Sequence, residues 1–210
     1  MKILILANLR SGSTTLFNAL YKSMKGYKGF CEPWNPSETK FGDSKSTYSL
    51  EYPNLIVKIL PWDLYFNYSF KIIDDSFQSN IISVNYVKSC IINSLNDYVI
   101  NFDKVILLNR KNKLEQAQSN SFAARNNLFH NNYEYDDFQD LSRSFNLIKN
   151  HDDILDYLSN SWKIPLIYYE DLFLGNTNNI DNFVKNYDLP VKDFKILYEY
   201  LNPKNRYRQG

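Results

Sequence analysis

Four short runs of apolar residues recur along the chain, and longer segments with helical periodicity separate them. The runs lack the polar–apolar alternation of a half-exposed strand, which favours strands buried on both faces, as in a parallel sheet. They are Lys2–Ala7, Leu55–Leu60, Lys104–Leu108 and Pro165–Tyr169. Strand–helix alternation with right-handed crossovers predicts a three-layer, P-loop-like α/β fold, in which helices flank a central and mostly parallel sheet.

The segments between these runs divide into helical patterns and two irregular stretches. Helices are predicted at Thr14–Met24, Ser83–Asn96, Lys113–Asn127, Ser142–Ser161, Ile180–Tyr187 and Val191–Leu201. The polar stretch Asn35–Tyr52 predicts a loop or lid, and Asn126–Asp140 predicts a surface insertion. The length of 210 residues, with no linker-like break, predicts a single domain over 1–210.

Charge and cysteine content exclude several classes of protein. The chain has 24 Lys and Arg against 23 Asp and Glu, which argues against a nucleic-acid binder with a broad basic face. Two cysteines, Cys31 and Cys90, are too few for a disulfide scaffold, and we expect reduced, half-buried thiols. The apolar run after Lys2 is too short for a signal peptide, and no stretch approaches the ~18 apolar residues of a membrane span. We therefore expect a cytoplasmic protein with no membrane partner, of unknown oligomeric state.

The segment Leu9–Thr15, between the first strand and the first helix, concentrates hydroxyl groups around one glycine beside an arginine. A helix N-terminus stabilises an anion through its unpaired N–H groups and its dipole, and the planar guanidinium of Arg10 matches phosphate oxygens. An ordinary helix cap needs only one hydroxyl. The pattern predicts an anion site formed by Arg10, Ser11, Gly12, Ser13, Thr14 and Thr15. The chain lacks the Walker A pattern GxxxxGK(S/T), which disfavours a P-loop kinase.

The run Arg10-Ser11-Gly12-Ser13-Thr14 resembles the phosphosulfate-binding loop of the sulfotransferase superfamily, which follows the first strand of the fold. Leu9 stands where a proline commonly precedes the basic residue of that family. The resemblance implies the sulfuryl donor 3′-phosphoadenosine 5′-phosphosulfate (PAPS), with adenosine 3′,5′-bisphosphate as product. No spacing of Cys, His and carboxylate residues in the sequence suggests a metal site.

Two later segments extend this resemblance. The predicted strand Lys104–Leu108 is followed by Asn109 and Arg110, and Ser119 comes nine residues after Arg110. They resemble the Arg and Ser that bind the 3′-phosphate, and the run between them is most similar to the bacterial trehalose-type branch. The alternative is a solvated amphipathic helix after a basic loop. Tyr168–Leu172 is similar to a late strand end of many sulfotransferases, and we interpret Glu170 and Asp171 there as structural groups that bond backbone or cap turns.

The resemblance also implies a general base. Ile59 stands where small-molecule sulfotransferases have a histidine, and we expect His130 and His151 to be solvated rather than catalytic. The run from Phe30 to Trp34 resembles the Glu-Pro element of glycan and trehalose branches, which implies Glu32 as the base. Pro33 predicts an extended Glu32 backbone, and the flanking aromatic rings predict apolar surroundings that raise its pKa. The alternative is a loop carboxylate whose neighbour Trp34 packs into the core.

Further residues have weaker assignments. Arg10 is expected to offset charge on the transferring oxygens, and Lys58 resembles a lysine that orients acceptor or sulfonate oxygens, with a solvated strand-end lysine as the alternative. Trp34, Trp62 and Tyr65 are candidates for an acceptor mouth that stacks on sugar rings. The basic tail Lys204–Gly210 is expected to be a frayed end, although it could close over the 3′-phosphate.

Together these features imply a PAPS-dependent sulfotransferase acting by in-line transfer with Glu32 as general base. The expected acceptor is a hydroxyl of a carbohydrate, either a small molecule or a glycan, and less readily a protein tyrosine. Two alternatives stay open: a P-loop kinase-like phosphotransferase, and a non-catalytic nucleotide-binding module. The sequence does not identify the acceptor.

Overall fold

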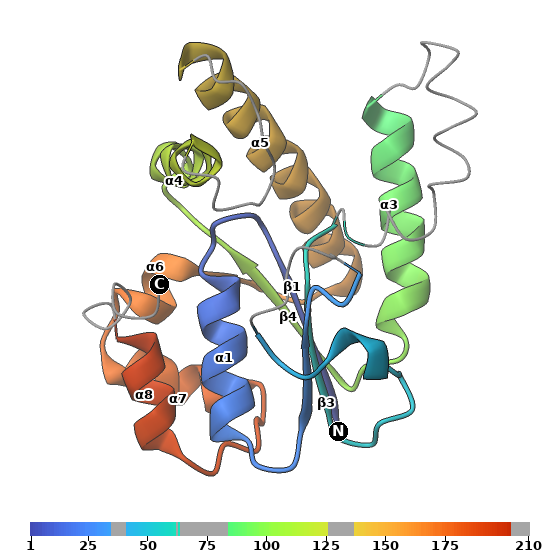
Figure 1. Ribbon diagram of the computed structural model, residues 1–210, viewed down its shortest axis with the longest axis vertical. Helices are drawn as coiled ribbons and strands as arrows, with labels where there is room; N and C mark the ends of the chain where they lie inside the picture. The colour runs from blue at the N-terminus through green and yellow to red at the C-terminus, as the bar shows by residue number, and fades with distance from the viewer. Residues whose placement is uncertain (35–40, 62, 64–83, 126–136, 203–210) are drawn as a thin grey trace.

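The computed structural model describes residues 1–34, 41–61, 63, 84–125 and 137–202 (Figure 1). Within these residues, five parallel strands form one sheet in the order β2-β3-β1-β4-β5. The strands are β1 (Lys2–Ala7), β2 (Lys28–Cys31), β3 (Leu55–Ile59), β4 (Lys104–Asn109) and β5 (Leu166–Tyr168). This all-parallel sheet with flanking helices confirms the predicted three-layer α/β fold.

Helices cover both faces of the sheet because alternate strand residues are apolar on each face. Ile3 and Ile5 of β1 pack toward α1, whereas Leu4 and Leu6 pack toward the opposite cluster. One face carries α1 (Ser13–Ser23), α6 (Tyr169–Phe173), α7 (Thr177–Asn186) and α8 (Phe194–Leu201). The other face carries α3 (Val84–Val99) and α5 (Asp137–Trp162), and α4 (Lys113–Arg125) packs against α5 (Figure 1).

All five strands end at the same edge of the sheet. The register pairs Leu6 with Ile59, Cys31 with Lys58, and Ala7 with Leu108. In open parallel sheets, ligands bind outside the carboxyl ends of the strands, where the chain leaves toward opposite faces. After β1 the chain leaves toward α1, and after β4 it leaves toward α4 and α5. The segments with predicted chemistry therefore share the edge at which such folds bind ligands.

The elements differ from the prediction at three places. The short β2 was not predicted, because four residues that include Lys28 and Gly29 carry little strand signal until they pair with β3. Tyr169 begins α6 instead of ending a strand. The predicted insertion Asn126–Asp140 overlaps α5, which already begins at Asp137, and its remaining residues lie outside the described part of the chain.

The described part of the predicted loop Asn35–Tyr52 is fixed to β2. It contains a 3-10 turn, η1 (Lys45–Thr47). Gly42 forms an isolated bridge with Phe30, and the Asp43 carboxylate accepts the Gly29 N–H at 2.8 Å. The Tyr48 ring packs edge-on against Phe30, with ring centroids 5.1 Å apart. Residues 41–52 are therefore a loop that lies on the body of the fold.

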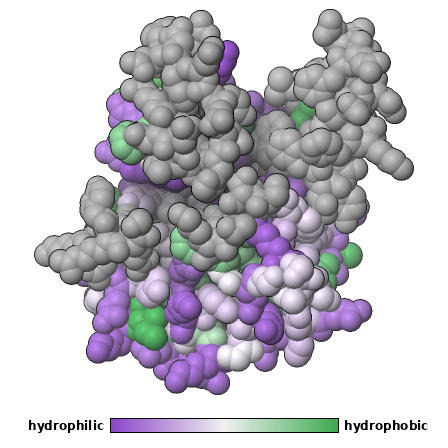
Figure 2. Space-filling model, viewed as in Figure 1, coloured by the Kyte–Doolittle hydropathy of each residue, from purple (hydrophilic) through white to green (hydrophobic). Residues whose placement is uncertain are grey.

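Two expectations about burial need correction. Both cysteines are free thiols, but only Cys90 is half-buried; Cys31 is fully buried because it lies on β2 beneath α1. His151 lies on α5 and is buried instead of solvated, and this burial lowers its pKa to about 3. Among the helices that the structure describes, none has the length and apolar character needed to cross a bilayer. Figure 2 shows that the visible described surface is mostly hydrophilic, with scattered apolar side chains.

Candidate functional site

The loop between β1 and α1 has the backbone of an anion-binding turn. Arg10 and Gly12 both have left-handed backbones, with φ of 54° and 80°. The helix begins at Ser13, and its N-cap residue is Gly12, which has no side chain to cap the first turn. The first N–H groups of a helix have no intrahelical acceptor, so they are available to an anion at this end. Ser11 is buried and donates its hydroxyl to the Asn8 carbonyl at 2.6 Å, so its side chain braces the loop.

Gly12 has a second reason to be glycine. A Cβ placed on it would lie 2.8 Å from Cδ2 of Tyr169 and 3.2 Å from Cε2 of Phe173. Those two rings stack on each other with centroids 4.9 Å apart, which holds them in place. The loop backbone therefore lies directly on the aromatic surface of α6, and a side chain at this position would push it away.

The second predicted anchor, Arg110, is held in a fixed position at the end of β4. Its Nη2 lies 2.6 Å from Oε2 of Glu115, and its Nε lies 3.7 Å from Oε1 of Glu170. Its guanidinium carbon lies 4.7 Å from the centroid of the Tyr169 ring. Only 14% of its side chain is exposed. Arg110 is therefore part of the same surface that supports Gly12, since both contact Tyr169.

The two predicted anchors meet in space. Nε of Arg10 donates to Oγ of Ser119 at 3.1 Å, although the two residues are 109 positions apart in the chain. The Gln116 side chain donates to the Leu9 carbonyl, which fastens α4 to the loop a second time. The Arg10 side chain still reaches solvent, yet the surrounding protein and the positive charge of Arg110 both lower its pKa. One cationic site is therefore formed by the loop between β1 and α1, the end of β4, and α4.

Glu170 has the structural role that the sequence predicted. Its carboxylate accepts the backbone N–H groups of Lys111 at 2.9 Å and Asn112 at 3.0 Å. Partial burial acts to raise the pKa of Glu170, but these two backbone hydrogen bonds and the charge of Arg110 lower it overall. The carboxylate thus orders the turn that leads from Arg110 into α4. Asp171 instead forms an exposed ion pair with Lys111 at 2.5 Å.

The predicted base, Glu32, forms a buried ion pair with Lys58. The Lys58 ammonium contacts Oε1 of Glu32, and the side chains are 2% and 10% exposed. The interpretation of Lys58 as a solvated lysine is therefore wrong. Burial acts to lower the pKa of Lys58, but the charge of Glu32, the neighbouring Cys31 and Asp63, and the hydrogen bond to Glu32 together more than offset this and raise it.

The backbone of Glu32 differs from the prediction. Its φ is 48°, so the extended conformation expected before Pro33 is wrong. The Glu32 N–H donates to the Lys58 carbonyl at 2.7 Å, and this bond together with the ion pair holds the turn at the end of β2. A left-handed non-glycine residue costs about 1–3 kcal/mol and is found where the surroundings impose it, which is common at functional sites. Arg10 and Glu32, the two principal candidates, both have this strain.

Asp63 is a third ionisable group at this end of the sheet, and the sequence analysis did not single it out. Its Oδ2 accepts the Leu60 N–H at 2.7 Å, in the turn that follows β3. Burial and the negative charge of Glu32 raise the pKa of Asp63 to about 7, while Lys58 acts in the opposite direction. Asp63 follows β3 by four residues, and Asp is among the residues that are common in turns.

The aromatic residues near Glu32 are largely accounted for by packing. Trp34 lies edge-on to Tyr48 and Tyr98, at centroid distances of 5.6 and 5.3 Å, and is packed against the core cluster on the α3 side. This matches the alternative in which Trp34 packs into the core. Trp62, Tyr65, His130 and the basic tail from Lys204 lie outside the described residues.

The cationic site and the Glu32–Lys58 pair lie at the same edge but on different strands. β3 separates β2 from β1, so the two strand ends are about 10 Å apart at the usual strand spacing. Within the described residues, no group of three or more His, Cys, Asp or Glu side chains is arranged to hold a metal ion.

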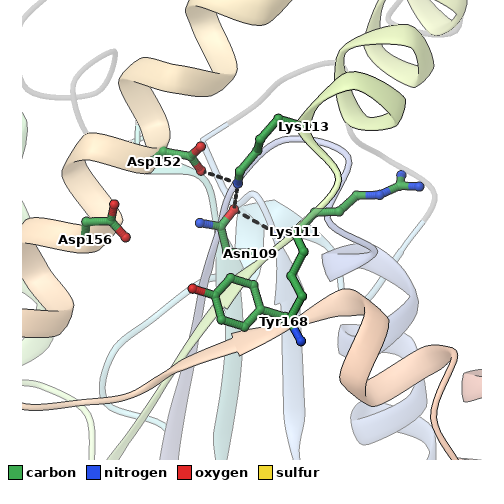
Figure 3. Close-up of a pocket in the computed structure, with 7 residues that line it drawn as sticks. Asn109, Lys111, Lys113, Asp152, Asp156 and Tyr168 are labelled. Atoms are coloured by element: carbon green, nitrogen blue, oxygen red, sulfur yellow. Dashed lines mark hydrogen bonds and ion pairs between the residues drawn. The ribbon is translucent and has the colours of Figure 1, made fainter.

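A cavity of about 400 Å³ opens behind Arg110. Its lining comes from the ends of β4 and β5, the start of α4 and the inner side of α5: Asn109, Arg110, Lys111, Lys113, Asp152, Asp156 and Tyr168 (Figure 3). Comparison with known proteins adds no assignment, since no family model and no curated protein matches the chain.

Proposed function

We propose that this protein is a sulfotransferase that uses PAPS as donor and a hydroxyl group as acceptor. The observation that carries the proposal is the meeting of Arg10, Ser119 and Arg110 at one edge of the sheet. Guanidinium groups at one edge of a sheet favour the binding of an anion between or beside them. A nucleotide with phosphate groups at both its 5′ and 3′ positions needs two anchors, and this site supplies them from separate elements.

The proposed roles follow from these positions. The loop residues Arg10–Thr15 would hold the 5′-phosphosulfate, and Arg110 with Ser119 would hold the 3′-phosphate. When bound, the donor supplies an activated sulfuryl group: its sulfur forms a bond to the acceptor oxygen while the sulfur–oxygen bond to the 5′-phosphate breaks. Arg10 offsets the charge that develops on the departing oxygen, and positioning together with such charge stabilisation supplies most of the rate in analogous phosphoryl transfers.

Glu32 would take the proton from the acceptor hydroxyl. A general base must be ionised, and the contact between Lys58 and Oε1 stabilises the carboxylate form. The ion pair also fixes the carboxylate in one orientation, which favours proton transfer from a hydroxyl bound in one place. Lys58 is therefore a positioning residue for the base in this proposal. We expect a carbohydrate acceptor and a cytoplasmic location, as the sequence analysis predicted.

A titration of adenosine 3′,5′-bisphosphate against ADP tests the cofactor. Two phosphate anchors predict that the bisphosphate binds at least about tenfold more tightly, since hydrogen bonds to charged groups contribute about 1.5–3 kcal/mol. Isothermal titration calorimetry gives both affinities. Equal affinities, or no binding of either ligand, would contradict the proposal, and Mg²⁺-dependent preference for ATP would favour a kinase.

Replacement of the proposed base tests the chemistry. Glu32→Gln should leave the affinity for the bisphosphate intact and lower turnover by about 10²–10⁴-fold in a sulfate-transfer screen with carbohydrate acceptors. Retained turnover would assign the base elsewhere. Tight bisphosphate binding without transfer to any acceptor of a broad panel would indicate a non-catalytic nucleotide-binding module.

A further inference from the structure

Four polar residues from four elements form a cluster behind the two anchors, which we call the Asp152 cluster. Asn8 follows β1, Asn109 ends β4, Lys113 begins α4, and Asp152 lies on α5. Figure 3 shows the last three converging at the cavity behind Arg110. None of the four belongs to the residues proposed to touch the nucleotide.

One carboxylate oxygen of Asp152 accepts hydrogen bonds from two residues, each of which lies close in sequence to one of the anchors. Its Oδ1 accepts from Nδ2 of Asn8 at 2.6 Å and from Nζ of Lys113 at 2.6 Å. Oδ1 of Asn109 accepts from the same Lys113 at 2.8 Å and from the backbone N–H of Arg110 at 2.8 Å. Asn8 immediately precedes the loop residues, and Asn109 immediately precedes Arg110. The cluster therefore connects the starting points of both anchors to α5.

Two members of the cluster are buried: Asn8 is fully buried and Asn109 is 3% exposed. Polar groups at such depth lose their hydration and need internal partners, which Nδ2 of Asn8 and Oδ1 of Asn109 find within the cluster, whereas Oδ1 of Asn8 has none among the described residues. The side chains of the Lys113–Asp152 ion pair are 28% and 17% exposed, and such a pair adds little net stability, so its clearest use is to specify geometry. Here the geometry specified is that of the two strand ends relative to α5.

The cluster also controls where α4 lies. Lys113 is the first residue of this helix. Later in the same helix, Gln116 contacts Leu9 of the loop and Ser119 contacts Arg10. Asp152 holds Lys113 at the start of α4, and it holds Asn8 at the base of the loop. Both routes from Asp152 therefore end at the contact between Arg10 and Ser119.

We propose that Asp152 is a positioning residue that sets the separation between the loop at Arg10–Thr15 and the anchor formed by Arg110 and Ser119. The inference rests on the proposed function, in which one nucleotide with two phosphate groups contacts both anchors. Asp152 itself does not contact the ligand. Its role is to hold the two anchors at the spacing at which both phosphate groups bind at once, because the affinity gained from the second phosphate depends on that spacing.

The test compares adenosine 3′,5′-bisphosphate with adenosine 5′-monophosphate, which engages only the loop. The ratio of their affinities measures the contribution of the second phosphate. In Asp152→Ala the ratio should fall about tenfold, whereas the affinity for the monophosphate should change little. Asp152→Asn keeps an acceptor for Asn8 but loses the charge that holds Lys113, so its ratio should lie between those of the wild type and Asp152→Ala.

Asp156→Ala is the matched control. Asp156 lies one turn further along α5 and lines the same cavity, but within the described residues its side chain has no hydrogen bond or ion pair to the anchors. This variant should keep the wild-type ratio. Thermal denaturation of every variant accompanies the titrations, and if Asp152→Ala does not fold, Asp152→Asn decides the matter.

The outcomes separate the two proposals. A wild-type protein that binds both nucleotides equally would overturn the proposed function and this inference with it. A wild-type preference for the bisphosphate that persists unchanged in the Asp152 variants would overturn the inference alone. A parallel loss of both affinities together with a lower melting temperature would assign Asp152 a merely structural role, which also overturns it.

Discussion

The two halves of the ligand-binding edge handle charge in opposite ways. At the ends of β2 and β3, Glu32 and Lys58 are buried and neutralise each other. At the ends of β1 and β4, Arg10 and Arg110 are like charges, and burial together with the charge of Arg110 lowers the pKa of Arg10. Glu115 and Glu170 partly compensate Arg110. The first arrangement pairs its charges completely within the protein, whereas an anion added to the second would gain from the charge of Arg10.

The two halves contribute differently to stability and to binding. A buried pair of opposite charges fixes the position of both groups, and removal of one partner leaves a charge without compensation. A pair of like charges at the rim of a helix N-terminus contributes little to folding but favours ligand binding. Substitutions at Glu32 and Lys58 should therefore affect stability first, and those at Arg10 and Arg110 should affect affinity first.

The largest expected effect comes from Lys58→Met, which leaves the buried Glu32 carboxylate without the Lys58 ammonium. We expect the free energy of unfolding to fall by about 3–5 kcal/mol. For a chain of this size the melting temperature should fall by about 10 °C. Chemical denaturation and calorimetry give both values.

Two comparison variants make this prediction sharp. Lys88→Met removes a more exposed ion pair with Asp153, at 2.5 Å, and should cost no more than about 1 kcal/mol. The double variant Glu32→Gln with Lys58→Met removes both buried charges and should recover most of the loss. A cost for Lys58→Met as small as that for Lys88→Met would refute the contrast between the two halves.

Much of this contrast could be predicted from the sequence, and the reason lies in local signals. Strong local patterns mark the β1 strand, the loop at Arg10–Thr15 and the segment from Arg110 to Ser119. The meeting of the two anchors then follows from the common edge at which parallel strands end. The contact of Glu32 with Lys58 was not predicted, because it depends on the register between β2 and β3. Since β2 itself lacks a local signal, neither the burial of Lys58 nor the left-handed backbone of Glu32 could be derived.

The other half of the comparison is tested by Arg110→Met. The affinity for adenosine 3′,5′-bisphosphate should fall about 10–100-fold, because hydrogen bonds to a phosphate group are lost. The melting temperature should change much less than in Lys58→Met, since Glu170 keeps its two backbone hydrogen bonds. Lys111→Met is the control, because its exposed ion pair with Asp171 should contribute little to either quantity. An Arg110 variant that loses stability but not affinity would reverse the assignment.

A smaller effect should come from Gly12→Ala, which adds a Cβ at a left-handed residue beside Tyr169. The backbone conformation alone costs about 1–2 kcal/mol. Gly26→Ala isolates that cost, because Gly26 has a φ of 87° and no atom within 4 Å of its added Cβ. Only Gly12→Ala should also weaken nucleotide binding, since the added methyl group would displace the ring that supports Arg110. Equal behaviour of the two variants in both stability and binding would show that the contact with Tyr169 has no role in the site.

A pH dependence of stability belongs to the Glu32–Lys58 half. Burial and the charge of Glu32 raise the pKa of Asp63 to about 7, above the ordinary value of 3.8. Between about pH 4 and 7 the folded chain therefore holds more protons on this group than the unfolded chain does. Stability falls with rising pH wherever the folded state binds more protons, so Asp63 should reduce the free energy of unfolding progressively across this window. The opposing attraction of Lys58 for the ionised carboxylate is already part of this raised value. Asp63→Asn should make the pH dependence less negative between pH 5 and 7, as measured by urea denaturation at several pH values. An unchanged slope would mean that Asp63 ionises as it does in water, and the charge of Glu32 would then be compensated by Lys58 alone.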